Sequence, residues 1–366
     1  MKVLTRWQLF CLYVLFELGT SVIFGFGRSA KQDAWIASGI STLVGFSLIG
    51  IYCKLIEWYP GKNWTSLLNH LFGRMVGNLL GFVYILFMIY DAGRDLRDFG
   101  ELMHTYILPK TPMGITMILL LAVITYSCYT GLVRIARLAE LIIPIVFIFL
   151  LTEFFLLTAT GIIDFSLLTP IAADWSSIWK TVFPLGVTVP YGETLSFAMF
   201  WAYTIEPKAY RRSVLLATLV GGMVLLILDF LAITTLGPMF DRLIYPLLSA
   251  FQLISLADFI DNIDAIVVTN FIIGGLLKIL ILTYAACIGI ADQWKIADYR
   301  VVIVPVSVIV LFFAIYMAEN IGSHLFVGLH WVVWILHVPL LICIPILALF
   351  ISMFHKKLEF SKGWFR

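Results

Sequence analysis

Hydrophobic residues fill long, nearly uncharged stretches of the chain, and polar residues gather in the short connections between them. A window of about 20 apolar residues is long enough to cross a bilayer as a helix. Such windows predict ten transmembrane helices, at roughly 5–26, 35–56, 76–104, 113–130, 133–158, 180–203, 211–236, 264–290, 300–318 and 330–354. We therefore expect an all-α polytopic membrane protein in which residues 1–366 form a single transmembrane domain.

Two of the connections have apolar residues at helical spacing. Residues 63–81 and 237–263 each predict a helix that lies along a membrane face. Lysine and arginine are concentrated in the connections on the side of the N-terminus, as is typical of cytoplasmic loops. Because an even number of spans returns the chain to the same side, we expect both termini to be cytoplasmic.

Composition narrows the function classes. Of the 366 residues, 61% are hydrophobic and 13% are charged, whereas soluble domains are about 25% charged. The net charge of +2 and the dispersed basic residues do not indicate nucleic-acid binding. The sequence contains no Walker loop, nucleophile elbow or zinc-protease motif, and its cysteines lack metal-site spacing. We therefore predict no enzymatic activity, no metal and no cofactor.

The sixth predicted span is interrupted within the stretch FPLGVTVPYGETLSF. Pro184 and Pro190 each remove a backbone donor, and Gly186 and Gly192 let the chain leave helical geometry. The carboxylate of Glu193 follows at once. In hydrocarbon, unpaired backbone groups are tolerated only where they meet protein, water or a ligand. The stretch therefore predicts a break in the helix with a special environment around it.

The first predicted span repeats this arrangement in the stretch FELGTSVIFGFG. Here Glu17 lies beside Gly19, and Thr20, Ser21 and Gly25 follow. Each of these two spans begins a set of five, and paired interruptions at matching positions indicate a binding site near the membrane midplane in inverted-repeat transporters. We place the first repeat at about 1–158 and the second at about 180–354.

Such a site has a definite chemistry. Half-helix N-termini and unwound amides would bind an anionic group such as an amino-acid carboxylate. Carbonyls, hydroxyls and a carboxylate such as Glu193 would take an ammonium group or a cation. The alternative is that the glycines serve close packing between membrane helices.

The third predicted span is charged within the stretch YDAGRDLRDFGE. At about 100° per residue, one stripe of this helix contains Asp91, Arg94, Asp95 and Asp98. Arg94 is spaced for ion pairs with Asp91 and Asp98, and Arg97 is spaced for a pair with Glu101. A charge at bilayer depth costs about 3 kcal/mol or more. The stripe is therefore either the wall of an outer vestibule or a self-neutralising ladder, and Tyr90 and Asp91, the deepest residues, favour the cavity.

Lys278 lies inside the eighth predicted span, with no acidic neighbour within two turns. A lone buried ammonium loses its proton or finds a partner, and Glu17 and Glu193 are the candidates. Lys278 would then stand in for a coupling cation; alternatively it snorkels to the cytoplasmic interface. The residues assigned to gating or coupling are Glu17, Arg94, Asp95, Lys278 and Tyr284.

The remaining polar residues inside the spans receive no role. His330 and His337 lie among tryptophans in the tenth span, which is typical of an aromatic belt at the membrane interface. Glu153 and Asp229 fall near the ends of their spans and are interpreted as structural.

Four stretches together resemble one known family. PLGVTVPYGETLSF, FELGTSVIFGFG, DAGRDLRDFGELM and YPLLSAFQLISLADFIDNID are similar to the B subunit of spore germinant receptors, the GerAB type. The likeness is most specific at Tyr191, Gly192 and Glu193 and at Leu256, Ala257, Asp258 and Phe259. It implies the amino acid-polyamine-organocation superfamily and its LeuT-like five-plus-five inverted repeat, with the first and sixth helices broken. It also implies that the site includes Gly19, Thr20, Ser21, Gly186, Val187 and Thr188.

The resemblance implies a membrane subunit that senses a small nutrient, an amino acid or a sugar, in the inner membrane of a dormant spore. It would act with an A-type subunit and a lipoprotein C-type subunit. The fold leaves a second hypothesis open, a secondary amino-acid transporter coupled to protons or sodium. Because superfamily members hold sodium or a lysine between the first and eighth spans, Lys278 leaves the sodium dependence undecided.

Overall fold

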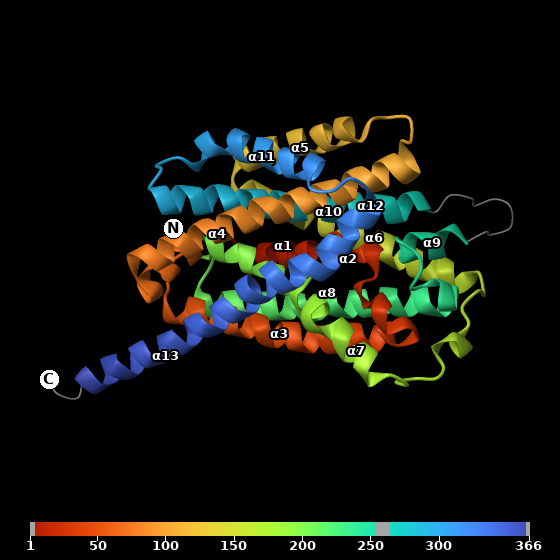
Figure 1. Ribbon diagram of the computed structural model, residues 1–366, viewed down its shortest axis with the longest axis horizontal. Coiled ribbons are helices and arrows are strands. Elements are labelled where there is room, and N and C mark those ends of the chain that lie inside the picture. The colour runs from red at the N-terminus through yellow and green to blue at the C-terminus, as the bar shows by residue number, and fades with distance from the viewer. Residues whose placement is uncertain (1–3, 254–263, 364–366) are drawn as a thin grey trace.

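The computed structural model describes residues 4–253 and 264–363, most of which are helical. The α-helices are α1 (Arg6–Leu18), α2 (Ser21–Phe24), α3 (Ala34–Trp58), α4 (Trp64–Leu102), α5 (Met113–Thr130), α6 (Leu132–Ala159), α7 (Trp175–Thr181), α8 (Pro207–Leu236), α9 (Pro246–Gln252), α10 (Asp264–Trp294), α11 (Ile303–Tyr316), α12 (Ile321–Phe326) and α13 (Ile344–Gly363). Tighter or wider helical turns connect them: η1 (Phe26–Asp33), η2 (Met103–Ile107), η3 (Phe165–Leu168), η4 (Val182–Gly186), η5 (Gly192–Met199), η6 (Trp201–Tyr203), η7 (Gly237–Met239), η8 (Tyr299–Val302) and η9 (Val327–Cys343). The long helices run side by side as one bundle (Figure 1).

Nine helical segments of the described chain are long and apolar enough to cross a membrane. They correspond to nine of the ten predicted spans, and α5 has the predicted bounds, Met113–Thr130. The predicted sixth span is covered by α7, η4, η5 and η6, which are each too short to qualify alone because the chain leaves helical geometry between them. The prediction of ten spans with a broken sixth is therefore confirmed.

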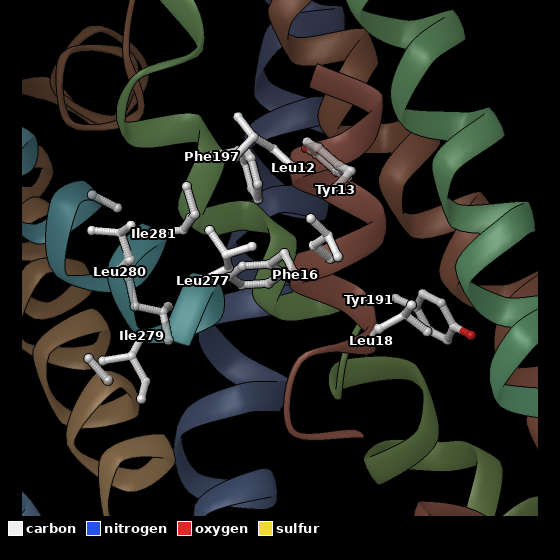
Figure 2. Packing of buried hydrophobic residues seen from close by; sticks show 14 of the residues in the cluster. Leu12, Tyr13, Phe16, Leu18, Tyr191, Phe197, Leu277, Ile279, Leu280 and Ile281 are labelled. Carbon is white, nitrogen blue, oxygen red and sulfur yellow. The ribbon is translucent and has the colours of Figure 1, made fainter. Parts of the chain in front are cut away.

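The interrupted first span occupies the centre of the bundle. In the most apolar 18-residue stretch of Arg6–Phe24, 89% is buried. The corresponding stretches of Leu132–Ala159 and Tyr299–Tyr316 are each 28% buried. Helix α1 packs against α8, α10 and α6. Its Phe16 meets Phe197 of η5 edge-on, with ring centroids 5.3 Å apart, in the apolar core shown in Figure 2. The first break is therefore surrounded by protein, while the outer helices present apolar side chains outward.

The structure agrees only in part with the helices predicted in the connections 63–81 and 237–263. The first begins at Trp64 and ends at Gly73, whose backbone (φ 78°, ψ 165°) separates it from the spanning part of α4. A helix therefore does precede the third span, but it is shorter than predicted. In the second connection, α9 covers Pro246–Gln252. Before α9, residues 237–245 form only the short η7 and turns, so the continuous helix predicted there is not observed. Residues 254–263 of that prediction, with Asp258 and Asp261, lie outside the described residues.

The tenth span departs from α-helical geometry over Val327–Cys343, where the backbone is π-helical around Pro339. A second proline, Pro345, has no N–H to donate to the carbonyl of Leu341 four residues earlier. Tyr52 of α3 donates its hydroxyl to that carbonyl at 2.5 Å, and Tyr84 of α4 donates to the carbonyl of Leu340. Side chains of neighbouring helices thus replace backbone partners that the irregular span lacks.

A capping box begins α1. The side chain of Thr5 accepts from the backbone N–H of Gln8 at 3.1 Å, and the side chain of Gln8 accepts from the N–H of Thr5 at 3.0 Å. We expect Thr5→Ala to lower the free energy of unfolding by about 1 kcal/mol, measured by denaturant unfolding of the purified chain in detergent. The control is Thr158→Ala, which removes an exposed hydroxyl bonded within its own helix and should change stability by no more than about 0.5 kcal/mol. Equal losses in the two variants would contradict a role for the cap.

Candidate functional site

The first break is centred on Gly19. The chain leaves the helix there (φ 25°, ψ −123°), and α2 resumes at Ser21. A Cβ atom on Gly19 would lie 2.7 Å from the carbonyl oxygen of Phe16 and 2.8 Å from Cδ of Lys278. Both the backbone conformation and the available space therefore require glycine. Helix α10 comes equally close from its side, since a Cβ on Gly274 would lie 2.8 Å from the Gly19 carbonyl oxygen.

The second break lies between α7 and η5. Phe183 has an extended backbone (φ −120°, ψ 129°), and residues 189–191 form a turn before η5 begins at Gly192. A Cβ on Gly186 would lie 2.2 Å from Oγ of Ser41, so α3 packs directly against the interruption. The two predicted breaks are confirmed, and their glycines also serve the close packing considered as the alternative.

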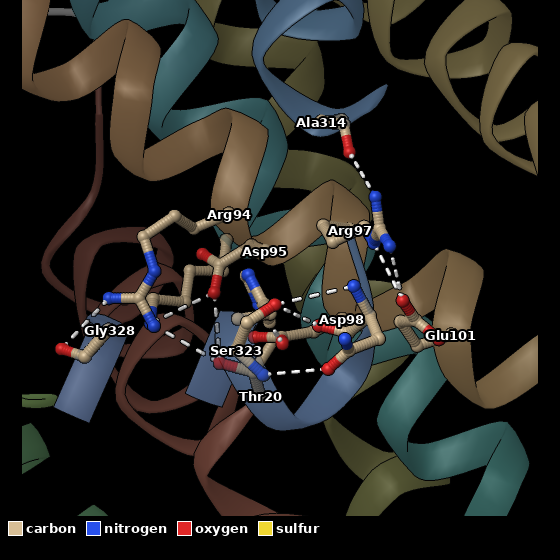
Figure 3. Close-up of polar contacts among 12 residues, drawn as sticks. Thr20, Arg94, Asp95, Arg97, Asp98, Glu101, Ala314, Ser323 and Gly328 are labelled. Atoms are coloured by element: carbon tan, nitrogen blue, oxygen red, sulfur yellow. Dashed lines mark hydrogen bonds and ion pairs between the residues drawn. The ribbon is translucent and has the colours of Figure 1, made fainter. Parts of the chain in front are cut away.

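A buried group of charges lies between the breaks, and we call Thr20, Asp91, Asp95, Glu193 and Lys278 the central cluster. Nζ of Lys278 lies 2.6 Å from Oε2 of Glu193 and 3.5 Å from Oδ1 of Asp95. Thr20 donates its hydroxyl to Oδ1 of Asp95 at 3.0 Å (Figure 3). The side chains of Lys278 and Glu193 are 2% and 3% exposed. Lys278 therefore joins α10 to α4 and to the second break, and the snorkelling alternative is wrong.

Farther along α4, one of the predicted ion pairs forms. Nη2 of Arg97 lies 2.6 Å from Oε1 of Glu101, and Nη1 donates to the carbonyl of Ala314 in α11 at 3.3 Å (Figure 3). The pair predicted between Arg97 and Glu101, beside the stripe, is therefore confirmed.

The pairs predicted for Arg94 are not the ones observed. Arg94 donates to the carbonyl of Gly328 at 3.5 Å, and a Cβ on Gly328 would lie 2.1 Å from Nη2 of Arg94. Asp98 bonds to Nε2 of His324 in α12 at 2.7 Å. Arg94 and Asp98 are therefore bound to the tenth span instead of pairing with each other within α4. His324 was not identified from the sequence, where nothing near it in the chain is charged except Glu319.

A cavity of about 20 Å³ adjoins the central cluster. It is lined by Thr20, Phe24, Asp91, Arg94, Asp95, Asp98, Val189, Glu193, Lys278, Leu325, Gly328 and Leu329. One water requires about 10–15 Å³ on this scale. In this conformation the cavity therefore holds one or two waters and is too small for an amino acid or a sugar, so binding of such a solute requires its walls to move apart.

His337 lies at the site and not in an interfacial belt, so that interpretation is wrong. Its side chain is fully buried, Nδ1 lies 3.4 Å from Oγ1 of Thr188, and the ring meets Phe87 edge-on at 5.5 Å. Ligand atoms of His337, Asp91 and Glu193 all lie within 4.8 Å of one another, an arrangement that could hold a metal ion. Lys278 already supplies a cation beside Glu193. The prolines of the tenth span were the sequence signal that could have drawn attention to this helix.

Two residues assigned to coupling lie elsewhere. Glu17 accepts a hydrogen bond from the Thr218 hydroxyl of α8 at 2.7 Å, so it is not the partner of Lys278. Tyr284 packs edge-on against Phe200 and Tyr299 and lines a different cavity. Of the coupling set, the structure brings together only Arg94, Asp95 and Lys278.

Of the residues predicted to bind the ligand, some lie in the central cluster and others lie elsewhere. Thr20, Asp91 and Glu193 meet in the central cluster. Tyr90 faces Phe313 of α11 with ring centroids 5.8 Å apart, and Gly25 takes a left-handed conformation (φ 56°) against Pro246 and Phe240. A second cavity is lined by Ser21, Gly186 and Tyr191. At the second break, Thr188 bonds back to the carbonyl of Pro184 at 3.0 Å, Val187 is buried beside it, and Gly192 approaches Leu341.

A helical bundle in which two interrupted spans enclose buried charges defines a polytopic membrane protein of the permease type. The fold is similar to that of a manganese transporter from Eremococcus coleocola solved with an aromatic bis-isothiourea compound, with a TM-score of 0.51 and 11% identity over 85% of this chain and 70% of that one. This likeness shows the LeuT-like fold alone. The chain belongs to the spore germination protein family, whose model matches residues 3–321.

Two relatives agree with this assignment. The chain is 30% identical to spore germination protein KB of Bacillus subtilis (strain 168) over 359 residues, which are 97% of this chain and 96% of that protein. It is 24% identical to spore germination protein XB of Bacillus anthracis over 263 residues, 69% of this chain and 70% of that protein. The resemblance found in the four sequence stretches is confirmed.

Proposed function

We propose that this protein is the nutrient-sensing membrane subunit of a spore germinant receptor and that it binds a small solute, an amino acid or a sugar, at the central cluster. The observation that supports this most is the position of Lys278, held by Glu193 and Asp95 where both broken spans meet. Buried cations beside buried carboxylates complement both ends of an amino acid. A ligand carboxylate would compete with Glu193 for Lys278, and a ligand ammonium would replace Lys278 at the carboxylates.

Sensing would proceed by a shift between two conformations. Because the cavity at the cluster is about 20 Å³, a nutrient binds only a state in which the walls have separated. A ligand with higher affinity for that state increases its population. The A-type and lipoprotein C-type subunits would convert this shift into ion release across the inner membrane of the spore, with both termini of this chain in the cytoplasm.

We expect Glu193→Gln to weaken nutrient binding about tenfold or more while leaving membrane insertion intact, because one charge-assisted contact is worth about 1.5 to 3 kcal/mol. A panel of amino acids and sugars first identifies the ligand of the wild-type chain in nanodiscs by calorimetry. Asp91→Asn, measured in the same way, should also weaken binding.

The matched control for this prediction is Glu153→Gln. Glu153 is also a carboxylate buried within the spans, where it accepts from Nδ2 of Asn270 at 2.8 Å, and the glutamine keeps an acceptor there. Its affinity for the nutrient should equal that of the wild type. A normal dose response in Glu193→Gln would remove Glu193 from the binding site.

The second candidate function is secondary transport of an amino acid coupled to protons or sodium. The three buried carboxylates of the central cluster favour it, because intramembrane carboxylates carry coupling charge in many transporters. Proteoliposomes that contain this chain alone separate the two functions. Accumulation of labelled nutrient identifies a transporter, and binding without net flux identifies a receptor.

A further inference from the structure

A second polar cavity lies beside the two breaks. Its volume is about 40 Å³, and its polar lining consists of four hydroxyl side chains, one tyrosine and one carboxylate. It shares a single lining residue, Val189, with the cavity of the central cluster. At the first break, Thr20 lines the cluster cavity while the next residue, Ser21, lines the second one. The interrupted segments thus form a wall between two separate polar sites.

The carboxylate of this cavity is Asp229 of α8, which is 8% exposed. It accepts a hydrogen bond from the hydroxyl of Ser38 in α3, and Gly27 leaves room for it, since a Cβ there would lie 2.9 Å from Oδ2. In the part of the chain that the structure describes, no lysine or arginine forms an ion pair with Asp229. An uncompensated charge is strongly unfavourable within the membrane, so an ionised Asp229 requires a cation from outside the chain.

The cavity also contains a hydroxyl that lacks a partner. Oγ of Ser21 is buried, the residue is 4% exposed, and it has no hydrogen bond among the described residues. Leaving a buried polar atom unpaired is unfavourable, because the atom loses its hydrogen bonds to water and gains none in return. Water in the cavity would satisfy this hydroxyl but would leave the charge of Asp229 uncompensated. A cation would satisfy both.

We propose that this cavity binds a monovalent alkali cation, with sodium as the probe ion, between Asp229 and the hydroxyl oxygens of Ser21, Ser38 and Ser41. A donor set made only of oxygen suits hard cations. Charge selects a monovalent ion, because one carboxylate neutralises a single positive charge and a divalent ion would leave an excess charge in the membrane. The volume of about 40 Å³ has room for an ion with one or two waters.

The proposed site differs from the sodium site that superfamily members have between the first and eighth spans, where this chain has Lys278. Lys278 lies at the contact of the first span with α10, whereas the proposed ion lies among the first span, α3, the second break and α8. A chain with a lysine between the first and eighth spans can therefore still bind sodium in the cavity at Asp229.

The test is equilibrium binding of radioactive sodium to the purified full-length chain in detergent, with choline as the balancing cation and no nutrient present. We expect saturable binding by the wild type and a loss of affinity of about tenfold or more in Asp229→Asn. Ser21→Ala, which removes one oxygen and no charge, should weaken binding while melting at the wild-type temperature. Glu153→Gln is the matched control, because Glu153 is likewise buried with one neutral hydrogen-bond partner, and it should bind sodium as the wild type does.

Absence of saturable sodium binding by the folded wild type, at both neutral and alkaline pH, would overturn the proposal and identify Asp229 as a neutral carboxyl group. Equal affinities in the wild type, Asp229→Asn and Ser21→Ala would also overturn it. Because no nutrient enters this experiment, its failure leaves the proposed sensing function untouched, and failure of the nutrient panel leaves the ion site untouched.

Discussion

Lys278→Met should destabilise the protein by about 3 to 5 kcal/mol. The substitution keeps most of the apolar stem but removes the ammonium that lies 2.6 Å from Glu193 and 3.5 Å from Asp95. Breaking a buried ion pair from one side leaves an uncompensated buried charge, which accounts for a loss of this size. The free energy of unfolding is measured by denaturant titration in mixed micelles, followed through tryptophan fluorescence.

Two further variants make this result specific. Lys54→Met removes a half-exposed ammonium that lies 3.7 Å from Glu57, and it should cost no more than about 1 kcal/mol. Combining Lys278→Met with Glu193→Gln should restore part of the lost stability, because one of the stranded charges is then gone. If Lys278→Met loses no more stability than Lys54→Met, the central cluster is not held together by this ion pair.

Gly19→Ala should lower the free energy of unfolding by about 2 to 5 kcal/mol. The backbone at Gly19 has a φ of 25°, which strains any L-residue by about 1 to 3 kcal/mol. The new methyl group would also lie 2.7 Å from the Phe16 carbonyl oxygen and 2.8 Å from Cδ of Lys278, and such overpacking costs about 1 to 3 kcal/mol. The measurement is the same unfolding titration, together with nutrient binding, which should weaken because Lys278 is displaced.

The control for this prediction is a glycine of α10 that faces the same break. A Cβ on Gly275 would have its nearest neighbour, Cγ2 of Thr20, at 3.8 Å, an ordinary contact. Gly275→Ala should therefore stabilise the helix by up to about 1 kcal/mol. Equal stabilities of Gly19→Ala and Gly275→Ala would show that the chain at Gly19 is a regular helix and would contradict the break.

The features that the sequence predicts well are those that depend on local composition. Apolar windows locate the spans because crossing a bilayer requires length and hydrophobicity, whichever neighbours the helix meets. The breaks at Gly19 and at Pro190 are predictable because glycine and proline change the backbone at their own positions. The likeness to spore germination proteins is visible for the same reason, since it is carried by continuous stretches.

The partners of the charged residues could not be predicted in this way, because they depend on how each helix is rotated about its axis. Glu17 and Glu193 both lie beside a break, yet only Glu193 faces Lys278, while Glu17 faces Thr218. Arg94 and Asp98 bind the tenth span, whose turns are wider than those of an α-helix. The tryptophans near His337 in the sequence therefore did not reveal that its side chain is buried beside Thr188.

The hydroxyls of Tyr52 and Tyr84 have a consequence for how the tenth span acquires its shape. They occupy the carbonyls of Leu341 and Leu340 just before Pro345, where the span has no backbone donor of its own to offer. An isolated peptide with the sequence of residues 327–350, inserted into lipid without α3 and α4, would leave these carbonyls unpaired or rearrange to bury them. The irregular course of this last helix therefore depends on two tyrosines that lie 289 and 256 residues earlier in the chain.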